Sequence, residues 1–114
     1  ANFIETLARP EAQALVKKVR ARYGADSTVS NTVDAHYNLA RFFIEAVKKA
    51  GSDDKEAIID ALGGLELMSG NGSVRMREND RHVDLNVLIS EVVGGKLVLR
   101  EDIGPVVAPS QCSQ

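Results

Sequence analysis

Cysteine is almost absent from this sequence of 114 residues, in which the single one, Cys112, is third from the C-terminal end. One thiol can form neither an internal disulfide nor a metal site that needs several cysteines. Because chain ends are commonly loose, we expect Cys112 to be a poorly ordered tail residue. The cysteine content therefore excludes a disulfide scaffold.

The sequence also lacks a long apolar run, a signal peptide and a basic stripe. No stretch approaches the 18 or more apolar residues that span a bilayer, and the first residues do not have the pattern of a secretory leader. The formal net charge is -2 at pH 7, so nucleic acid is not an expected partner. With 44% hydrophobic and 26% charged residues, the composition is that of a soluble globular domain.

Groups that could carry catalysis or bind metal are few. His36 is expected on a helix surface or in packing, and His82 in a turn. His82 with Asp80 and Asp84 is the only candidate metal cluster, and two ligands on one strand face make a poor site. No serine lies in a nucleophile elbow, and residues 70–73 lack the lysine and following helix of a phosphate-binding loop. We therefore expect no catalytic residue, no metal, no cofactor and no enzyme activity.

Two segments have the periodicity of amphipathic helices. The first covers residues 10–23, where Pro10 suits the first helical position and Gly24 is a typical end. The second runs from about residue 33 to residue 50, with Asn31 as its expected cap. Its apolar residues cover more than one stripe, so we expect it to be buried on much of its surface.

A third, shorter helix is predicted to begin at Ser52 or Asp53. Asp53 and Glu56 have the spacing of a capping box, in which each side chain hydrogen-bonds the other residue's backbone. The pair Gly63-Gly64 ends this helix.

Beyond the third helix the apolar period changes to two, which predicts strands over residues 74–77, 83–90 and 97–99. Asn79 and Asp80 form the first turn. Gly94-Gly95 predicts a two-residue hairpin, since both positions can take positive φ. The segment 104–114 has no period and is expected to be extended and peripheral. The predicted layout is three helices followed by a three-stranded antiparallel unit.

These elements leave apolar faces without enough layers to cover them. That imbalance is typical of a piece of a larger α/β protein. A homodimer or a domain swap of this chain is the other way to cover such surface.

Three stretches resemble, in order and spacing, the C-terminal part of type I periplasmic binding proteins, the solute-binding proteins of ABC transporters. They are RPEAQALVKKVRARYGAD, VDAHYNLARFFIEAVKKAGSDDKEAIIDALGGL and GNGSVRMRENDRHVDLNVLISEVVGGKLVLRED. The similarity is strongest to the urea and short-chain-amide branch, which is related to branched-chain amino-acid binders. Tyr23-Gly24 and Asp34-Ala35 match the family pattern, as does the turn at 78–82. Asp34 stands where the amide branch commonly has glutamate, and His36 stands where it has a small residue.

The resemblance implies an α/β, two-lobed fold of which residues 1–114 are the C-terminal segment, with crossovers between the lobes near residues 27–31 and 68–72. It implies that the whole protein captures a small polar solute, such as an amide, urea or an amino acid, between the lobes. The implied partners are that solute, the membrane subunits of an ABC permease and the missing N-terminal part of the same protein. The implied location is periplasmic.

Asp34 is the residue for which the resemblance implies ligand contact, because it would lie at a helix start that faces the cleft. A carboxylate there accepts hydrogen bonds from an amide N–H or an ammonium group. The alternative is that Asp34 only stabilises the positive end of its own helix. Tyr37 is expected to pack in the core.

Two other functions stay open at this point. The same fold serves as a cytoplasmic amide sensor in a regulatory protein. A self-associating interaction module would also account for the uncovered apolar faces.

Overall fold

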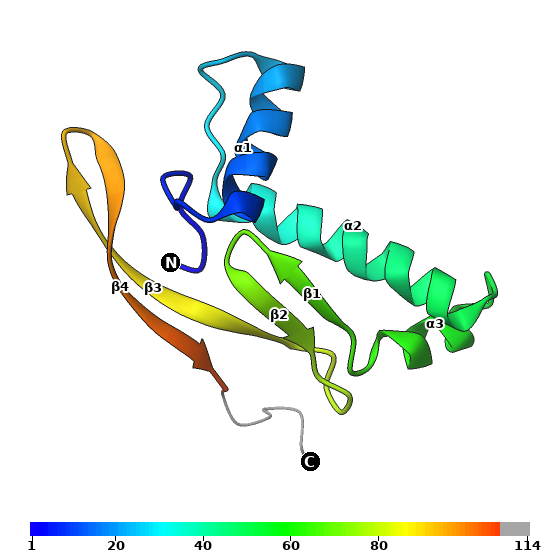
Figure 1. Ribbon diagram of the computed structural model, residues 1–114. Coiled ribbons are helices and arrows are strands. Elements are labelled where there is room, and N and C mark those ends of the chain that lie inside the picture. The colour runs from blue at the N-terminus through cyan, green and yellow to red at the C-terminus, as the bar shows by residue number, and fades with distance from the viewer. Residues whose placement is uncertain (108–114) are drawn as a thin grey trace.

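The computed structural model describes residues 1–107 and consists of three helices followed by an antiparallel sheet (Figure 1). The elements are α1 (Pro10–Tyr23), α2 (Asn31–Ala50), α3 (Lys55–Leu62), β1 (Glu66–Ser69), β2 (Gly72–Met76), β3 (Val83–Val93) and β4 (Lys96–Val106). The four strands lie in the order β1-β2-β3-β4. The predicted order of helices and strands is confirmed, and the sheet has one strand more than predicted, β1.

Two predicted helix caps are each off by one residue. The Ser30 hydroxyl, not Asn31, accepts the hydrogen bond from the Val33 amide, at 3.4 Å, because α2 begins at Asn31 itself. The carboxylate of Asp54, not Asp53, accepts from the Ala57 amide at 2.9 Å. In both cases the oxygen lies three residues before the amide that it caps, as an N-cap requires.

The buried apolar residues form two separate clusters rather than one core. We call them the first core and the second core. The first core consists of Phe3, Ile4, Leu7, Ala12, Leu15, Val16, Val29 and Leu88. The second core consists of Phe42, Val74 and Met76, with Leu62, Leu65, Leu67, Val83 and Leu85 packed against them.

In the described part of the chain, two elements contribute to both cores. Helix α2 packs Val33 and Tyr37 against the first core and buries Phe42 in the second. Strand β3 packs Leu85 against the second core and buries Leu88 in the first. The chain therefore passes between the cores along α2 and again along β3.

The predicted crossover at residues 68–72 is wrong. Ser69 pairs with Gly72, so this segment is the tight turn of the β1–β2 hairpin. The passage to the other core comes later, within β3. Sequence alone could not separate these two cases, because a glycine-rich stretch suits a tight turn as well as a crossover.

The β1–β2 turn packs closely between the two cores. Asn71 is fully buried, and its side-chain amide donates to the Asn86 carbonyl at 3.0 Å. The Asn86 side chain donates in return to the Asn71 carbonyl at 2.9 Å, and the Arg9 guanidinium donates to the same carbonyl. Arg9 also forms an ion pair with Asp102 of β4. The turn is thus tied to β3, to β4 and to the residue before α1.

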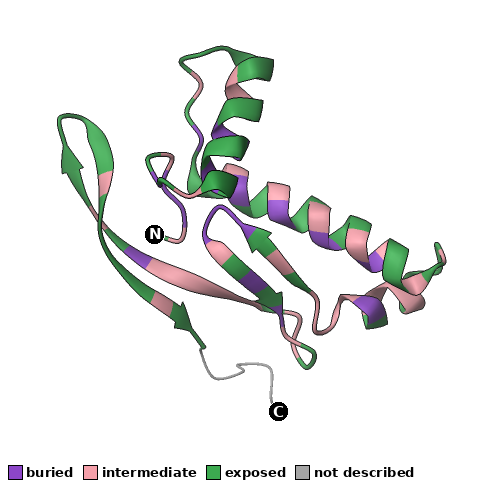
Figure 2. Ribbon diagram, in the orientation of Figure 1, coloured by how far each residue is buried: buried purple, intermediate pink, exposed green. Residues whose placement is uncertain are grey.

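Helix α2 is buried along one stripe only, in contrast to the prediction (Figure 2). The stripe consists of Asp34, Asn38, Phe42 and Ala46. The apolar residues Leu39, Phe43 and Ile44 are 60%, 55% and 50% exposed. The helix was expected to be covered more fully because its apolar residues extend around it, and residues 1–107 do not supply the layer that would cover them.

Strand β4 continues to Val106, so residues 104–106 are not part of a tail without secondary structure. Pro105 is compatible with this strand because β4 is the edge of the sheet, where a missing N–H can face outward. Cys112 and the other residues after 107 lie outside the described part of the chain. Within residues 1–107, no helix is both long and apolar enough to cross a membrane.

Gly70 offers a test of the contact between the β1–β2 turn and the first core. A Cβ atom at this position would lie 2.7 Å from the buried Phe3 ring and 3.1 Å from the Ala12 Cα. We predict that Gly70→Ala lowers the free energy of unfolding by about 1–3 kcal/mol, the usual cost of overpacking. Urea denaturation of both chains measures it.

Gly63→Ala is the matched control, because Gly63 also has a negative φ and its added Cβ would lie 3.4 Å from the nearest atom. It should change the free energy of unfolding by less than about 1 kcal/mol. Equal effects of the two substitutions would mean that the turn does not pack tightly on Phe3 and Ala12.

Candidate functional site

A pair of polar side chains occupies the start of the buried stripe of α2. Asp34 and Asn38 are one helical turn apart, and they are 1% and 7% exposed. The Asn38 side-chain amide donates to Asp34 Oδ2 at 3.0 Å. Burial of a carboxylate is uncommon in protein interiors and requires compensation by hydrogen bonds or charge.

Two of the three side-chain oxygens of this pair have no hydrogen-bond partner within residues 1–107. Among residues 1–107, no donor reaches Asp34 Oδ1 or Asn38 Oδ1. A buried polar atom without a partner costs about 1–3 kcal/mol. These two atoms lie on adjacent turns of one helix, and we call them the acceptor pair.

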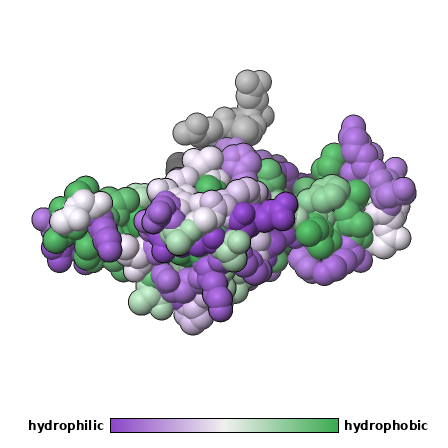
Figure 3. All heavy atoms as spheres, turned by 90° about the horizontal axis from the view of Figure 1, so that it is seen from above, coloured by the Kyte–Doolittle hydropathy of each residue, from purple (hydrophilic) through white to green (hydrophobic). Residues whose placement is uncertain are grey.

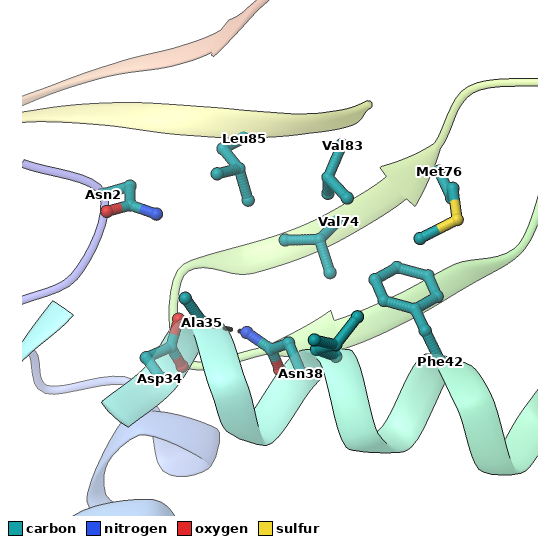
Figure 4. Close-up of a pocket in the computed structure, with 10 residues that line it drawn as sticks. Asn2, Asp34, Ala35, Asn38, Phe42, Val74, Met76, Val83 and Leu85 are labelled. Atoms are coloured by element: carbon teal, nitrogen blue, oxygen red, sulfur yellow. Dashed lines mark hydrogen bonds between the residues drawn. The ribbon is translucent and has the colours of Figure 1, made fainter. Parts of the chain in front are cut away.

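The acceptor pair lies at one end of a hollow between α2 and the strands, with a volume of about 250 Å³ (Figure 4). Phe42 points from the helix toward the strands, and Val83 and Leu85 point from β3 toward the helix. The lining residues are Asn2, Asp34, Ala35, Asn38, Leu39, Phe42, Val74, Met76, Val83 and Leu85. The hollow is apolar except near Asn2, Asp34 and Asn38.

Burial raises the pKa of Asp34 to about 6, while the hydrogen bond from Asn38 and the charge of Arg41 act in the opposite direction. Asp34 also borders a second, smaller hollow that Glu11 of α1 and Arg41 of α2 line. The carboxylate is therefore mostly ionised at pH 7 and is protonated in mildly acidic solution.

The other residues considered in the sequence are apart from this pair. His36 is exposed, with its Nδ1 2.8 Å from the Thr32 carbonyl. His82 is exposed beside the predicted turn, and Asp80 and Asp84 both form ion pairs with Arg77. Within residues 1–107, no group of three or more potential metal ligands comes together. Tyr37 packs against the first core, as predicted, and its hydroxyl accepts from Lys18 at 3.0 Å.

Asn38 is the residue that the sequence analysis missed. It lies four positions after Asp34, so helical periodicity places both on one face. The signal was present in this spacing, but a lone asparagine inside an apolar helix does not by itself indicate a site.

Comparison with known protein families shows to which family this chain belongs. The model of the periplasmic binding protein domain matches residues 1–111. The chain belongs to this family. The α/β architecture agrees with the type I fold of solute-binding proteins of ABC transporters, which the sequence resemblance implied.

Solved structures support the same fold. The chain aligns with a solute-binding protein from R. palustris in complex with benzoate at a TM-score of 0.82 and 22% identity, over 95% of this chain and 30% of that chain. It aligns with a leucine-binding protein from Thermotoga maritima at a TM-score of 0.75 and 20% identity, over 92% of this chain and 30% of that chain. The chain thus spans less than a third of the solved proteins that it resembles.

One similar protein has the name of an enzyme. A limonene hydroxylase from Geobacillus stearothermophilus is 24% identical over 90 residues, which are 79% of this chain and 16% of that protein. A similarity this low, over so small a part of that protein, transfers no activity to this chain.

The raised pKa of Asp34 predicts how stability changes with pH. The folded-state pKa of about 6 lies above the ordinary value of 3.8, so ionisation of Asp34 opposes folding. Ionisation of Asp34 therefore lowers the free energy of unfolding by its full amount above pH 6, and this effect disappears as the pH falls toward 4. At 1.36 kcal/mol per unit of pKa, it amounts to about 3 kcal/mol at most.

Asp34→Asn removes the ionisable group and keeps an oxygen for the Asn38 amide. We predict that it makes the chain more stable than the wild type at pH 8 by up to about 3 kcal/mol, with no difference near pH 4. Urea denaturation across this pH range measures the effect. Asp60→Asn, at an exposed position of α3, is the control and should show no such trend. A difference between wild type and Asp34→Asn that does not depend on pH would contradict the account.

Proposed function

We propose that this chain is the C-terminal segment of an extracytoplasmic solute-binding protein of an ABC importer, which captures a small polar solute between two lobes. The proposed solute is an amide, urea or an amino acid, and the proposed role is transport rather than catalysis. The observation that carries the proposal is the family match over residues 1–111, combined with the unused acceptor pair on α2.

The two cores support a two-lobed protein. The buried residues form two separate cores, and within residues 1–107 α2 and β3 are the only elements that contribute to both. Asp34 and Asn38 lie on α2 between Val33, which packs against the first core, and Phe42, which is buried in the second. A group at this junction is well placed to contact a solute held between two bodies.

The chemistry of the acceptor pair favours a solute with N–H groups. An amide, a urea or an ammonium group donates hydrogen bonds, and the ionised Asp34 strengthens those bonds. A carboxylate, such as the benzoate bound by the R. palustris protein, would place a second negative charge near Asp34. The acceptor pair therefore favours the N–H end of an amide, urea or amino acid.

The proposed partners follow from the same account. The N-terminal part of the protein covers the exposed apolar residues Leu39, Phe43 and Ile44 of α2. The whole protein delivers its solute to the membrane subunits of an ABC permease and is located in the periplasm. The aligned solute-binding proteins, of which this chain spans less than a third, support this arrangement.

Solute binding is tested with the full-length product of the gene. We predict that acetamide, urea or leucine raises its melting temperature, whereas benzoate does not. A solute at 100 times its Kd stabilises the folded protein by about 2.7 kcal/mol. Differential scanning fluorimetry with each compound measures this shift.

The role of Asp34 needs a separate variant. In the full-length protein, Asp34→Asn should abolish most of the solute-induced shift, and Asp60→Asn should keep it. If no compound of the panel shifts the melting temperature, the proposed solute class is wrong. If Asp34→Asn keeps the full shift, Asp34 does not contact the solute.

A further inference from the structure

The β1–β2 turn contains a dipeptide, Asn71-Gly72, with an intrinsic chemical reactivity. The backbone nitrogen of the residue after an asparagine can attack the side-chain amide carbon, which closes a five-membered succinimide ring and releases ammonia. Water then adds to the ring and opens it to aspartate or isoaspartate, so an amide is exchanged for a carboxyl group. A following glycine favours ring closure, because it has no Cβ to obstruct the attack. Asn71 is the one asparagine of the sequence that precedes a glycine.

The folded chain encloses this dipeptide. Asn71 is 0% exposed, and its side-chain nitrogen donates to the Asn86 carbonyl at 3.0 Å. Its backbone amide donates to Ser69 Oγ at 3.0 Å, and its backbone carbonyl accepts from the side chains of Asn86 and Arg9. Ring closure expels the side-chain nitrogen and so breaks its bond to Asn86. The folded state therefore opposes the reaction.

The first core covers the same turn from another side. Gly70, the other residue of the turn, packs so tightly that an added Cβ would lie 2.7 Å from the Phe3 ring. Helix α1 lies above the turn in Figure 1, and the view from above shows a mainly hydrophilic surface over the middle of the molecule (Figure 3). Water thus contacts the outside of this layer, whereas opening of the succinimide ring needs water at the buried turn.

Neither product of the reaction fits the turn. An aspartate at position 71 would hold a carboxylate oxygen against the Asn86 carbonyl, so two acceptors would meet where a donor and an acceptor meet now. A buried carboxylate without a partner is costly. Isoaspartate instead lengthens the backbone by one carbon within a hairpin loop that is closed by the pair Ser69 and Gly72. A modified chain therefore loses the tight turn.

We propose that Asn71-Gly72 is a site of spontaneous deamidation, which the fold protects and which reacts irreversibly in chains whose β1–β2 turn has opened. The turn is tied to β3, and through Arg9 to Asp102 of β4, so its modification weakens the packing between the two cores. The reaction consumes only water. It marks chains that have been unfolded and hinders their return to the native fold. This inference does not depend on the identity or the presence of a solute.

Peptide mass spectrometry measures the reaction at this one position. Cleavage after Lys55 and Arg75 releases residues 56–75, which contain Asn71 as their single asparagine. We expect deamidation of this peptide to be about tenfold slower or more in the native full-length protein than in the same protein unfolded in urea at the same pH. The peptides that contain Asn31 and Asn86, which precede other residues than glycine, are internal controls and should react much more slowly in urea.

Two glycine variants test whether opening of the turn limits the reaction, and both substitutions lie in the same peptide. Gly70→Ala, which overpacks the turn against Phe3, should raise the native rate about fivefold or more, because a larger fraction of the chains is open. Gly63→Ala should leave the native rate unchanged. In urea the wild type and both variants should react at one rate, since neither substitution alters the reacting dipeptide.

Asn71→Asp supplies the aspartate product directly. It should lower the urea concentration at which half of the protein is unfolded, whereas Asn79→Asp, at an exposed position, should not. Equal rates of deamidation in the native and the unfolded protein would overturn the inference, as would a lack of reaction at Asn71 in urea. An Asn71→Asp protein as stable as the wild type, or a native rate that Gly70→Ala does not raise, would also overturn it.

Discussion

The structure depends on strand β3, which contributes side chains to both hydrophobic cores. Among residues 1–107, α2 is the one other element that does so. Leu88 fills the first core, and Val83 and Leu85 pack against the second. Successive side chains of a strand alternate between its faces, so Val83 and Leu85 lie on one face of β3 and Leu88 lies on the other. The neighbours of β3 also change along its length, since β2 borders its start and Ala1 borders Leu88.

The position of the acceptor pair follows from this division. Asp34 and Asn38 lie on α2 where the helix passes from one core to the other, so neither core supplies donors for their free oxygens. In a chain that folded around a single core, such buried acceptors would lower the stability of the fold, and no interaction would compensate for the loss. In a protein whose two bodies hold a solute between them, unused acceptors at the junction are what recognition of an N–H group requires.

Sequence reasoning succeeded where local chemistry determines the structure. Helical periodicity located α1 and α2, and Gly94-Gly95 located the β3–β4 hairpin, since both glycines have positive φ. It missed β1, whose four residues are too few to show an alternation beside the glycines that precede it. It also placed the second passage between cores at residues 68–72, because only tertiary packing shows that β3 serves both cores. Asp34 was singled out through the family resemblance, and its contact with a ligand stays a prediction, whereas Asn38 required knowledge of which face of α2 is buried.

The central claim is that the rest of a longer protein covers the apolar surface that this chain exposes, and thiol labelling tests it most directly. Leu39→Cys, combined with Cys112→Ser, places one thiol on α2 at a position that is 60% exposed. Lys48→Cys in the same background, near the end of the same helix, is the exposed control. The account predicts that the thiol at position 39 reacts quickly in the isolated chain and much more slowly in the full-length gene product, while the thiol at position 48 reacts quickly in both. Equal rates at position 39 in the two proteins, or a gene product no longer than this chain, would contradict it.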